Sequence, residues 1–134
     1  MSANLDLVRS IYAARERGDY SSTEWAHPEI EFVLTGGPTD GSWTGVDAMG
    51  EAWRDFLSAW EDVRAEAEEY RELDGERVLV LVRIGGRGKA SGLELGQMRA
   101  KAAALYHVRG GKVTRLVVYA DSDRALAELG LLRS

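Results

Sequence analysis

The strongest constraint on this chain is a run of alternating side chains from Gly92 to about Ala120, interrupted at Arg109-Gly110-Gly111-Lys112. Alternation with a period of two is typical of β-strands, and paired glycines between two such segments favour a hairpin turn. We expect a three-residue loop in which Gly111 supplies the positive φ, because a two-residue loop would shift the register by one residue. That shift would place Arg115 on the same face as the alanines.

The predicted register separates the hairpin side chains into an apolar face and a mixed face. The apolar face carries Met98, Ala100, Ala102, Ala104, Tyr106, Val108, Leu116, Val118 and Ala120. The mixed face carries Arg99, Lys101, Leu105, His107, Arg115, Val117 and Tyr119. Alternating alanines leave volume that larger side chains would fill, so either the helices approach the sheet closely or a cavity remains. We expect a cavity.

The first half of the chain shows the spacing of helices. Apolar residues predict a helix over 4–17, with Asn4 as its N-cap, and a short helix over 19–26 that stops before Pro28. A strand is expected over 29–34, followed by a glycine-rich loop over 35–45. A third helix is expected from a Thr44 cap to about Trp60.

The second half reads mainly as strands. Alternation predicts a strand from residue 63 that continues past a bulge to 73, a turn at Asp74-Gly75, and a central strand over 77–84. A closing helix begins at Asp121 or Ser122 and ends at Gly130. Early helices and late strands predict a single α+β domain over 1–134, with a curved antiparallel sheet wrapped around the N-terminal helices.

Composition excludes several classes of function. The net charge of -5 argues against a nucleic-acid partner, and no apolar run is long enough to span a membrane. The N-terminus lacks the apolar stretch of a signal peptide, and cysteine is absent, so we expect a cytoplasmic protein. Two histidines far apart give no metal-ligand spacing, and we expect no metal and no cofactor.

Several short segments resemble a known superfamily when taken in order. They are Ile11-Tyr12-Ala13-Ala14 to Gly18-Asp19, His27 to Phe32, Trp43 to Ala48, Gly111-Lys112-Val113, and Ala125-Leu126 to Gly130-Leu131. Together they resemble the nuclear transport factor 2-like superfamily, in particular its SnoaL-like and ketosteroid-isomerase-like branch. The resemblance implies a cone-shaped fold with a pocket at its open end and, in many members, a homodimer through the outer sheet face.

The resemblance also bears on catalysis. The tyrosine, the aspartate base and the protonated aspartate of ketosteroid isomerases fall by alignment on Ile11, Val33 and Ala104, so both carboxylates are missing. This argues against steroid isomerisation by that mechanism. In SnoaL-type polyketide cyclases an acid/base aspartate follows the last strand, and Asp121 matches that position. The alternative for Asp121 is an N-cap of the final helix.

Two side chains are the candidate acid/base residues, His27 and Asp121. A neutral imidazole can act as a base near pH 7, although His27 could equally be a structural histidine bonded to a loop. The candidate ligand-binding residues are Tyr12, Trp25, Trp43, Trp53, Ala104 and Tyr106. Trp43 lies among glycines and is either a lid over the cavity or a loop-packing residue.

Two functions remain open from the sequence. The first is a cofactor-independent isomerase, polyketide cyclase or dehydratase that acts on a hydrophobic, polycyclic or terpenoid-like substrate. The second is a ligand-binding or dimerisation module without turnover, which is favoured by an inner face that carries no charged side chain.

Overall fold

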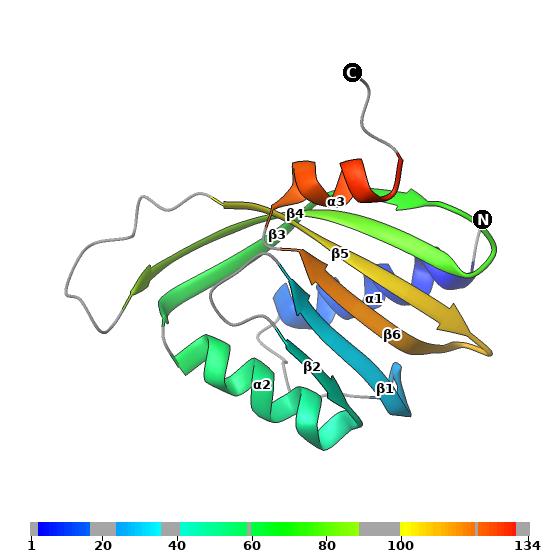
Figure 1. Cartoon of the computed structure of the whole chain (residues 1–134), viewed down its shortest axis with the longest axis horizontal. Helices are drawn as coiled ribbons and strands as arrows, with labels where there is room; N and C mark the ends of the chain where they lie inside the picture. Colours follow the sequence, from blue (N-terminus) through cyan, green and yellow to red (C-terminus); the bar gives the residue numbers. More distant parts are fainter. Residues whose placement is uncertain are drawn as a thin grey trace.

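The computed structural model describes residues 3–16, 24–35, 41–58, 60–88, 100–119 and 121–130, which form three helices and one mixed sheet (Figure 1). The helices are α1 (Ala3–Glu16), α2 (Val46–Ser58) and α3 (Ser122–Glu128). The strands are β1 (Ala26–Thr35), β2 (Gly41–Thr44), β3 (Trp60–Glu72), β4 (Arg77–Gly88), β5 (Ala100–Arg109) and β6 (Lys112–Tyr119).

The six strands follow the order β2-β1-β6-β5-β4-β3. Every neighbouring pair is antiparallel except β1 and β6, which run parallel. The helices α1 and α2 pack against one face of the sheet, and α3 packs on the other face, in front of the strands in Figure 1. We call these the inner face and the outer face. The predicted α+β class is therefore confirmed.

The hairpin of β5 and β6 differs from the prediction in its loop. Arg109 pairs with Lys112, so the loop has two residues, and both Gly110 (φ 60°) and Gly111 (φ 78°) adopt positive φ. The predicted three-residue loop is wrong. The predicted faces are nevertheless correct, because Thr114 is an extra residue on β6 and restores the register before Arg115. Its hydroxyl donates to the His107 carbonyl over 3.3 Å.

The inner face of the sheet forms the main hydrophobic core. Alternate residues of β5 and β6 lie in this core with Val8, Ile11 and Tyr12 of α1 and with Met49 and Ala52 of α2. Burying this much apolar surface against two helices supplies most of the stability of the fold. The predicted hairpin residues 92–99 and Ala120 lie outside the described residues.

Several predicted boundaries move in the structure. Asn4 lies inside α1, where its amide donates to the Gly75 carbonyl over 2.8 Å, so it is not the N-cap. Gly45 precedes α2 and its carbonyl accepts from the Met49 amide, so Gly45 holds the N-cap position and Thr44 is the last residue of β2. α2 ends at Ser58, and Trp60 begins β3.

The expected second helix is contradicted over its described part. Glu24 and Trp25 form a turn, and β1 already begins at Ala26 and continues through Pro28. Proline lacks an amide donor and is tolerated here at the start of the strand. Residues 19–23 of the predicted helix lie outside the described residues. The predicted glycine-rich loop over 35–45 also differs, because it contains the short strand β2, which carries Trp43.

Candidate functional site

A group of three tyrosines, two buried and one partly buried, lies on the inner face beneath α1. The ring of Tyr12 packs edge-to-face against Tyr70 of β3 (6.0 Å between centroids) and against Tyr106 of β5 (6.1 Å). The Tyr106 hydroxyl donates to the Tyr12 hydroxyl over 3.0 Å. Tyr106 and Tyr12 are almost fully buried, at 0% and 4% exposure, so this pair brings hydroxyl groups into an otherwise apolar core. A buried hydroxyl pair is stable because each group compensates the desolvation of the other.

A second aromatic group lies beneath α2. Phe32 of β1 is 1% exposed and contacts Trp43 at 5.9 Å between ring centroids and Trp53 at 6.2 Å. Trp43 is the direct cross-strand partner of Phe32, which explains why both rings face the same side of the sheet. Trp43 and Trp53 are only partly buried.

Small and partly exposed side chains continue the inner face next to these rings. Ala104 of β5 pairs with Val118 of β6, and Val118 pairs with Leu34 of β1, so the three lie in one row across the sheet. Val118 and Leu34 are partly exposed, whereas the preceding row of Tyr106, Leu116 and Phe32 is at most 3% exposed. We call Ala104, Val118 and Leu34, with Trp43 and Trp53, the inner-face site.

The structure brings five of the six predicted ligand-binding residues together on the inner face, whereas Trp25 lies at the start of β6, where its carbonyl accepts the Val113 amide. Tyr12, Ala104 and Tyr106 are buried in the inner core, and Trp25, Trp43 and Trp53 pack against it. Along β5 the Ala104 side chain is two residues, or about 7 Å, from Tyr106. The tyrosine hydroxyl pair therefore lies one row from the inner-face site.

The two candidate acid/base residues lie at opposite ends of the sheet. His27 is near Val113 at the start of β6, because Ala26 pairs with Val113, whereas Asp121 follows Tyr119 at the end of that strand. Six residues of extended strand separate Val113 from Tyr119, a distance of about 20 Å. One small molecule cannot touch both side chains in this arrangement.

Both acid/base candidates have local partners. The His27 ring is partly buried and its Nδ1 accepts the backbone amide of Glu29 over 3.0 Å. Asp121 is exposed, and its Oδ1 accepts the Asp123 amide over 2.9 Å at the start of α3. The capping role considered for Asp121 is thus present, and its role in catalysis stays a prediction.

The capping and catalytic roles of Asp121 can be separated by two substitutions. Asparagine is as good an N-cap as aspartate but cannot transfer a proton, whereas alanine can do neither. We expect Asp121→Ala to lower the free energy of unfolding by about 1 kcal/mol and Asp121→Asn to change it little. Urea unfolding measures this. Equal losses in the two variants would contradict the capping role.

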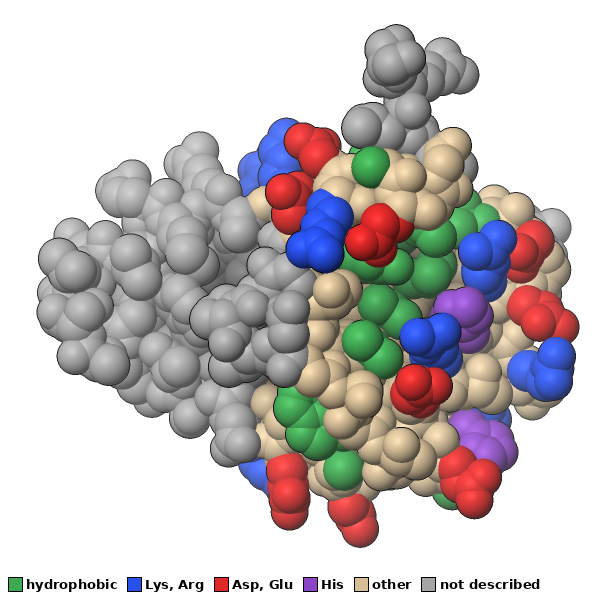
Figure 2. Space-filling model, in the orientation of Figure 1, with side chains coloured by type: hydrophobic (Ala, Val, Ile, Leu, Met, Phe, Trp, Pro, Cys, Tyr) green, Lys and Arg blue, Asp and Glu red, His purple; other side chains and the backbone are tan. Residues whose placement is uncertain are grey.

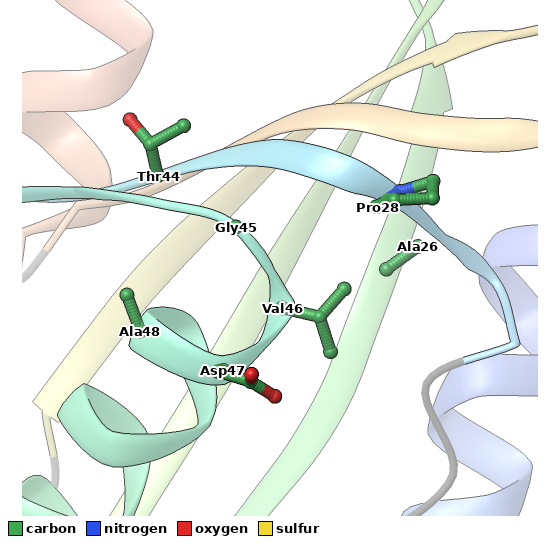
Figure 3. Close-up of a pocket in the computed structure, with 7 residues that line it drawn as sticks. All are labelled: Ala26, Pro28, Thr44, Gly45, Val46, Asp47 and Ala48. Carbon is green, nitrogen blue, oxygen red and sulfur yellow. The ribbon is translucent and has the colours of Figure 1, made fainter.

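A shallow pocket of about 560 Å³ opens at the start of α2 (Figure 3). It is lined by Ala26, Pro28, Thr44, Gly45, Val46, Asp47 and Ala48. In Figure 3, Ala26 and Val46 point toward each other, and the Asp47 carboxylate lies on the helix side. The pocket contains none of the predicted site residues, although it adjoins His27 in sequence.

Tyr70 is the residue of this region that sequence reasoning missed. Simple alternation from Ala67 places Tyr70 on the outer face, because the two are three residues apart. In the structure Glu68 is an extra residue between the pairs Ala67–Val82 and Glu69–Leu81, and this bulge turns Tyr70 inward. The predicted bulge in this strand was the available signal, but its position could not be inferred.

Two further observations limit the chemistry of the described residues. Within residues 3–16, 24–35, 41–58, 60–88, 100–119 and 121–130, no group of three or more metal-ligating side chains could hold a metal ion. None of the helices in this part of the chain has the length and apolar composition that crossing a membrane requires.

Comparison with known proteins identifies the family. A sequence model of the SnoaL-like domain matches residues 8–116, which include most of α1, all of β1 and most of β6. The chain belongs to the SnoaL-like domain family. The resemblance expected from the sequence is confirmed. Among curated proteins, none matches the chain.

Solved structures of similar fold extend the comparison to nearly the whole chain. An NTF2-like protein from Burkholderia thailandensis aligns with a TM-score of 0.79 and 20% identity over 99% of this chain and 100% of its own. A protein with a ketosteroid isomerase-like fold from Catenulispora acidiphila, in complex with trimethylamine, aligns at 0.68 and 17% identity over 98% and 96%. TerC co-crystallized with polyporic acid aligns at 0.71 and 24% identity over 96% and 98%. These identities show a shared fold.

Proposed function

We propose that this SnoaL-like domain binds a small hydrophobic molecule, polycyclic or terpenoid-like, at the inner-face site. The observation that carries the proposal is the row of Ala104, Val118 and Leu34, where small or partly exposed apolar side chains lie beside the fully buried row of Tyr106. Accessible apolar surface with a few polar groups is the usual form of a small-molecule site. Two solved structures of similar fold contain small molecules, trimethylamine in one and polyporic acid in the other, which supports the same use here.

The tyrosine hydroxyl pair supplies the polar contact that such a site needs. The pair is buried, so a ligand oxygen reaches it only where the ligand displaces neighbouring side chains of the inner core; there a hydroxyl can both donate and accept. A ketone, phenol or quinone oxygen fits this chemistry. Among the buried side chains of the described residues, the tyrosine phenols are the only ionisable groups.

The enzymatic form of the proposal is an isomerase-like or polyketide-cyclase-like reaction with Asp121 as the acid/base. Asp121 follows Val118 of the inner-face site by three residues, whereas His27 lies near the far end of β6. His27 is therefore the second candidate for this role. The non-catalytic alternative, a ligand-binding module, is favoured by the lack of a carboxylate or imidazole in the described inner core.

Quenching of intrinsic tryptophan fluorescence tests the proposal. The panel contains steroids, aromatic polyketides, terpenoids and short fatty acids. We expect saturable quenching by at least one polycyclic or terpenoid compound, because Trp43 and Trp53 border the site and are partly exposed. Val118→Phe fills the site and is expected to weaken this binding at least about tenfold, equivalent to about 1.4 kcal/mol. No saturable quenching by any panel compound would overturn the proposal.

Three further variants define the site. Trp43→Phe and Trp53→Phe assign the quenched indole. Tyr106→Phe keeps the ring but removes the hydroxyl. We expect it to lower the affinity for oxygenated ligands more than the affinity for hydrocarbons of the same shape. Product formation with a bound ligand, lost in Asp121→Asn but retained in His27→Asn, would support the enzymatic form. Tight binding without product formation would favour the non-catalytic module.

We also propose that the chain forms a homodimer through the outer face. Leu105, Val117 and Tyr119 lie on this face as predicted, but they are at most 7% exposed, because α3 and neighbouring side chains cover them. Figure 2 shows apolar side chains below α3, bordered by charged side chains and a histidine. Val33 and Leu81 remain partly exposed. A monomer in sedimentation equilibrium at micromolar concentration would contradict this proposal.

A further inference from the structure

Gly41 lies at the edge of the sheet, in line with the inner-face site. It is the first residue of β2, the edge strand that packs beside α2 (Figure 1), and it pairs with Leu34 of β1. Because Leu34 pairs with Val118 and Val118 with Ala104, Gly41 is the last residue of the row that runs through the site. The row therefore ends at a residue without a side chain.

The Trp43 indole occupies the space above Gly41. A Cβ on Gly41 would lie 3.0 Å from Cη2 of Trp43, 3.3 Å from Cζ2 and 3.5 Å from Cζ3. A ring that pointed its edge at Gly41 would hold the two flanking atoms much farther away than the nearest one. The similar distances to three adjacent ring atoms mean that the ring presents its face. The indole thus lies over the backbone, where any other residue would carry its side chain.

The backbone conformation does not explain the glycine at this position. Gly41 is not among the glycines that adopt positive φ in the described residues. It lies in a regular antiparallel ladder with β1, where β-branched residues are favoured and glycine weakens the strand. A glycine in a strand often marks the close approach of another group. Here that group is the Trp43 ring.

The indole extends the inner-face site to the edge of the sheet. Its second face points away from Gly41, and Trp43 is only partly buried. With neighbouring strands about 4.8 Å apart, the row from Ala104 to Gly41 is about 14 Å long. Aromatic rings stack favourably on one another with an offset. A flat ligand that spans the row would therefore end on the indole.

We propose that Gly41 is a positioning residue that determines which ligands the inner-face site accepts. By leaving room for the Trp43 indole to lie flat, it lets the site bind flat ligands long enough to reach β2. This inference rests on the proposed ligand-binding function, because it concerns the same site. Gly41 acts through Trp43, since the indole covers its inner side.

Gly41→Val tests whether the indole needs the space above residue 41. Valine suits a strand, but its Cβ and methyl groups would occupy the position of the ring and displace it. We expect the Trp43 indole N–H resonance to move in the proton–nitrogen NMR spectrum, where the signal lost in Trp43→Phe assigns it. The matched control is Ser42→Val, which adds the same side chain to the opposite, exposed face of β2. An indole resonance that Gly41→Val moves no further than Ser42→Val would overturn the inference.

Ligands of two lengths separate this role from a general loss of structure. The probes are 2-hydroxyanthraquinone, which has three fused rings, and phenol, which has one, and NMR titration measures both affinities. We expect Gly41→Val to weaken hydroxyanthraquinone binding at least about tenfold and phenol binding less than about twofold, because only the longer probe reaches the indole. In Trp43→Phe, which lacks the indole, adding Gly41→Val should change neither affinity further. Thermal unfolding verifies that the variants are folded.

Two outcomes separate this inference from the proposed function. Equal fold-losses for the two probes would overturn the length-dependent role of Gly41 and leave ligand binding at the site intact. Failure of hydroxyanthraquinone to bind the wild type would also overturn the inference. The proposed function itself would fall only if the wild type also showed no saturable quenching by the fluorescence panel.

Discussion

Phe32→Ala is expected to lower the free energy of unfolding by about 3–5 kcal/mol, the usual cost of removing a buried aromatic ring. Phe32 is 1% exposed and contacts both Trp43 and Trp53, so its removal leaves a cavity lined by rings from β2 and α2. Such rings cannot collapse fully into the space, because each is fixed by its own strand or helix. Urea unfolding followed by circular dichroism measures the loss.

Val33→Ala is the matched control for this prediction. Val33 is the next residue of the same strand, but it points to the outer face and is partly exposed. We expect a loss of about 1 kcal/mol, the typical effect of a single substitution. The structure indicates that the inner core depends on Phe32. Equal losses of stability in the two variants would contradict this.

Gly111→Val is expected to lower the free energy of unfolding by about 2 kcal/mol. The left-handed conformation costs an L residue roughly 1–2 kcal/mol, and β-branched residues adopt it poorly. Gly111 has φ 78°, and a Cβ there would meet no atom within 4 Å. The cost therefore arises from the backbone and not from a clash. Unfolding by urea, monitored by tryptophan fluorescence, measures it.

Gly110→Asn is the control for the hairpin. Gly110 also has positive φ (60°) with open space around it, but asparagine adopts this conformation readily, and Asn-Gly is a favoured two-residue hairpin loop. We expect a change of less than about 0.5 kcal/mol. A large loss in this variant would show that the loop does not have the two-residue form.

The same fold carries many activities, so the functional conclusion depends on the site and not on the family. In this chain the inner-face site combines two indole rings with small or partly exposed apolar side chains and lies one row from a buried hydroxyl pair, whereas the two acid/base candidates are separated along β6. Ligand binding is therefore the function that these side chains support best, and Asp121 is the residue on which an enzymatic role depends.

The sequence by itself determined the features that local chemistry controls. The side-chain alternation of 100–118 assigned the inner and outer faces correctly, and the two glycines located the turn. Asp74 accepts the amides of Glu76 and Arg77, as a turn residue should, and Asp121 caps α3. Each of these depends on neighbours within a few residues.

Only the tertiary structure decided the features that depend on distant strands. The extra residues Thr114 and Glu68 set the registers of β6 and β3, which preserved the hairpin faces despite a shorter loop and turned Tyr70 toward Tyr12. The parallel pairing of β1 and β6 put His27 and Asp121 near opposite ends of the sheet. Local sequence determines which residues alternate along a strand. A bulge shifts the register by one residue and so moves every later side chain to the other face of the sheet. Whether that shift is favourable depends on the packing of distant strands and helices, which local sequence does not show.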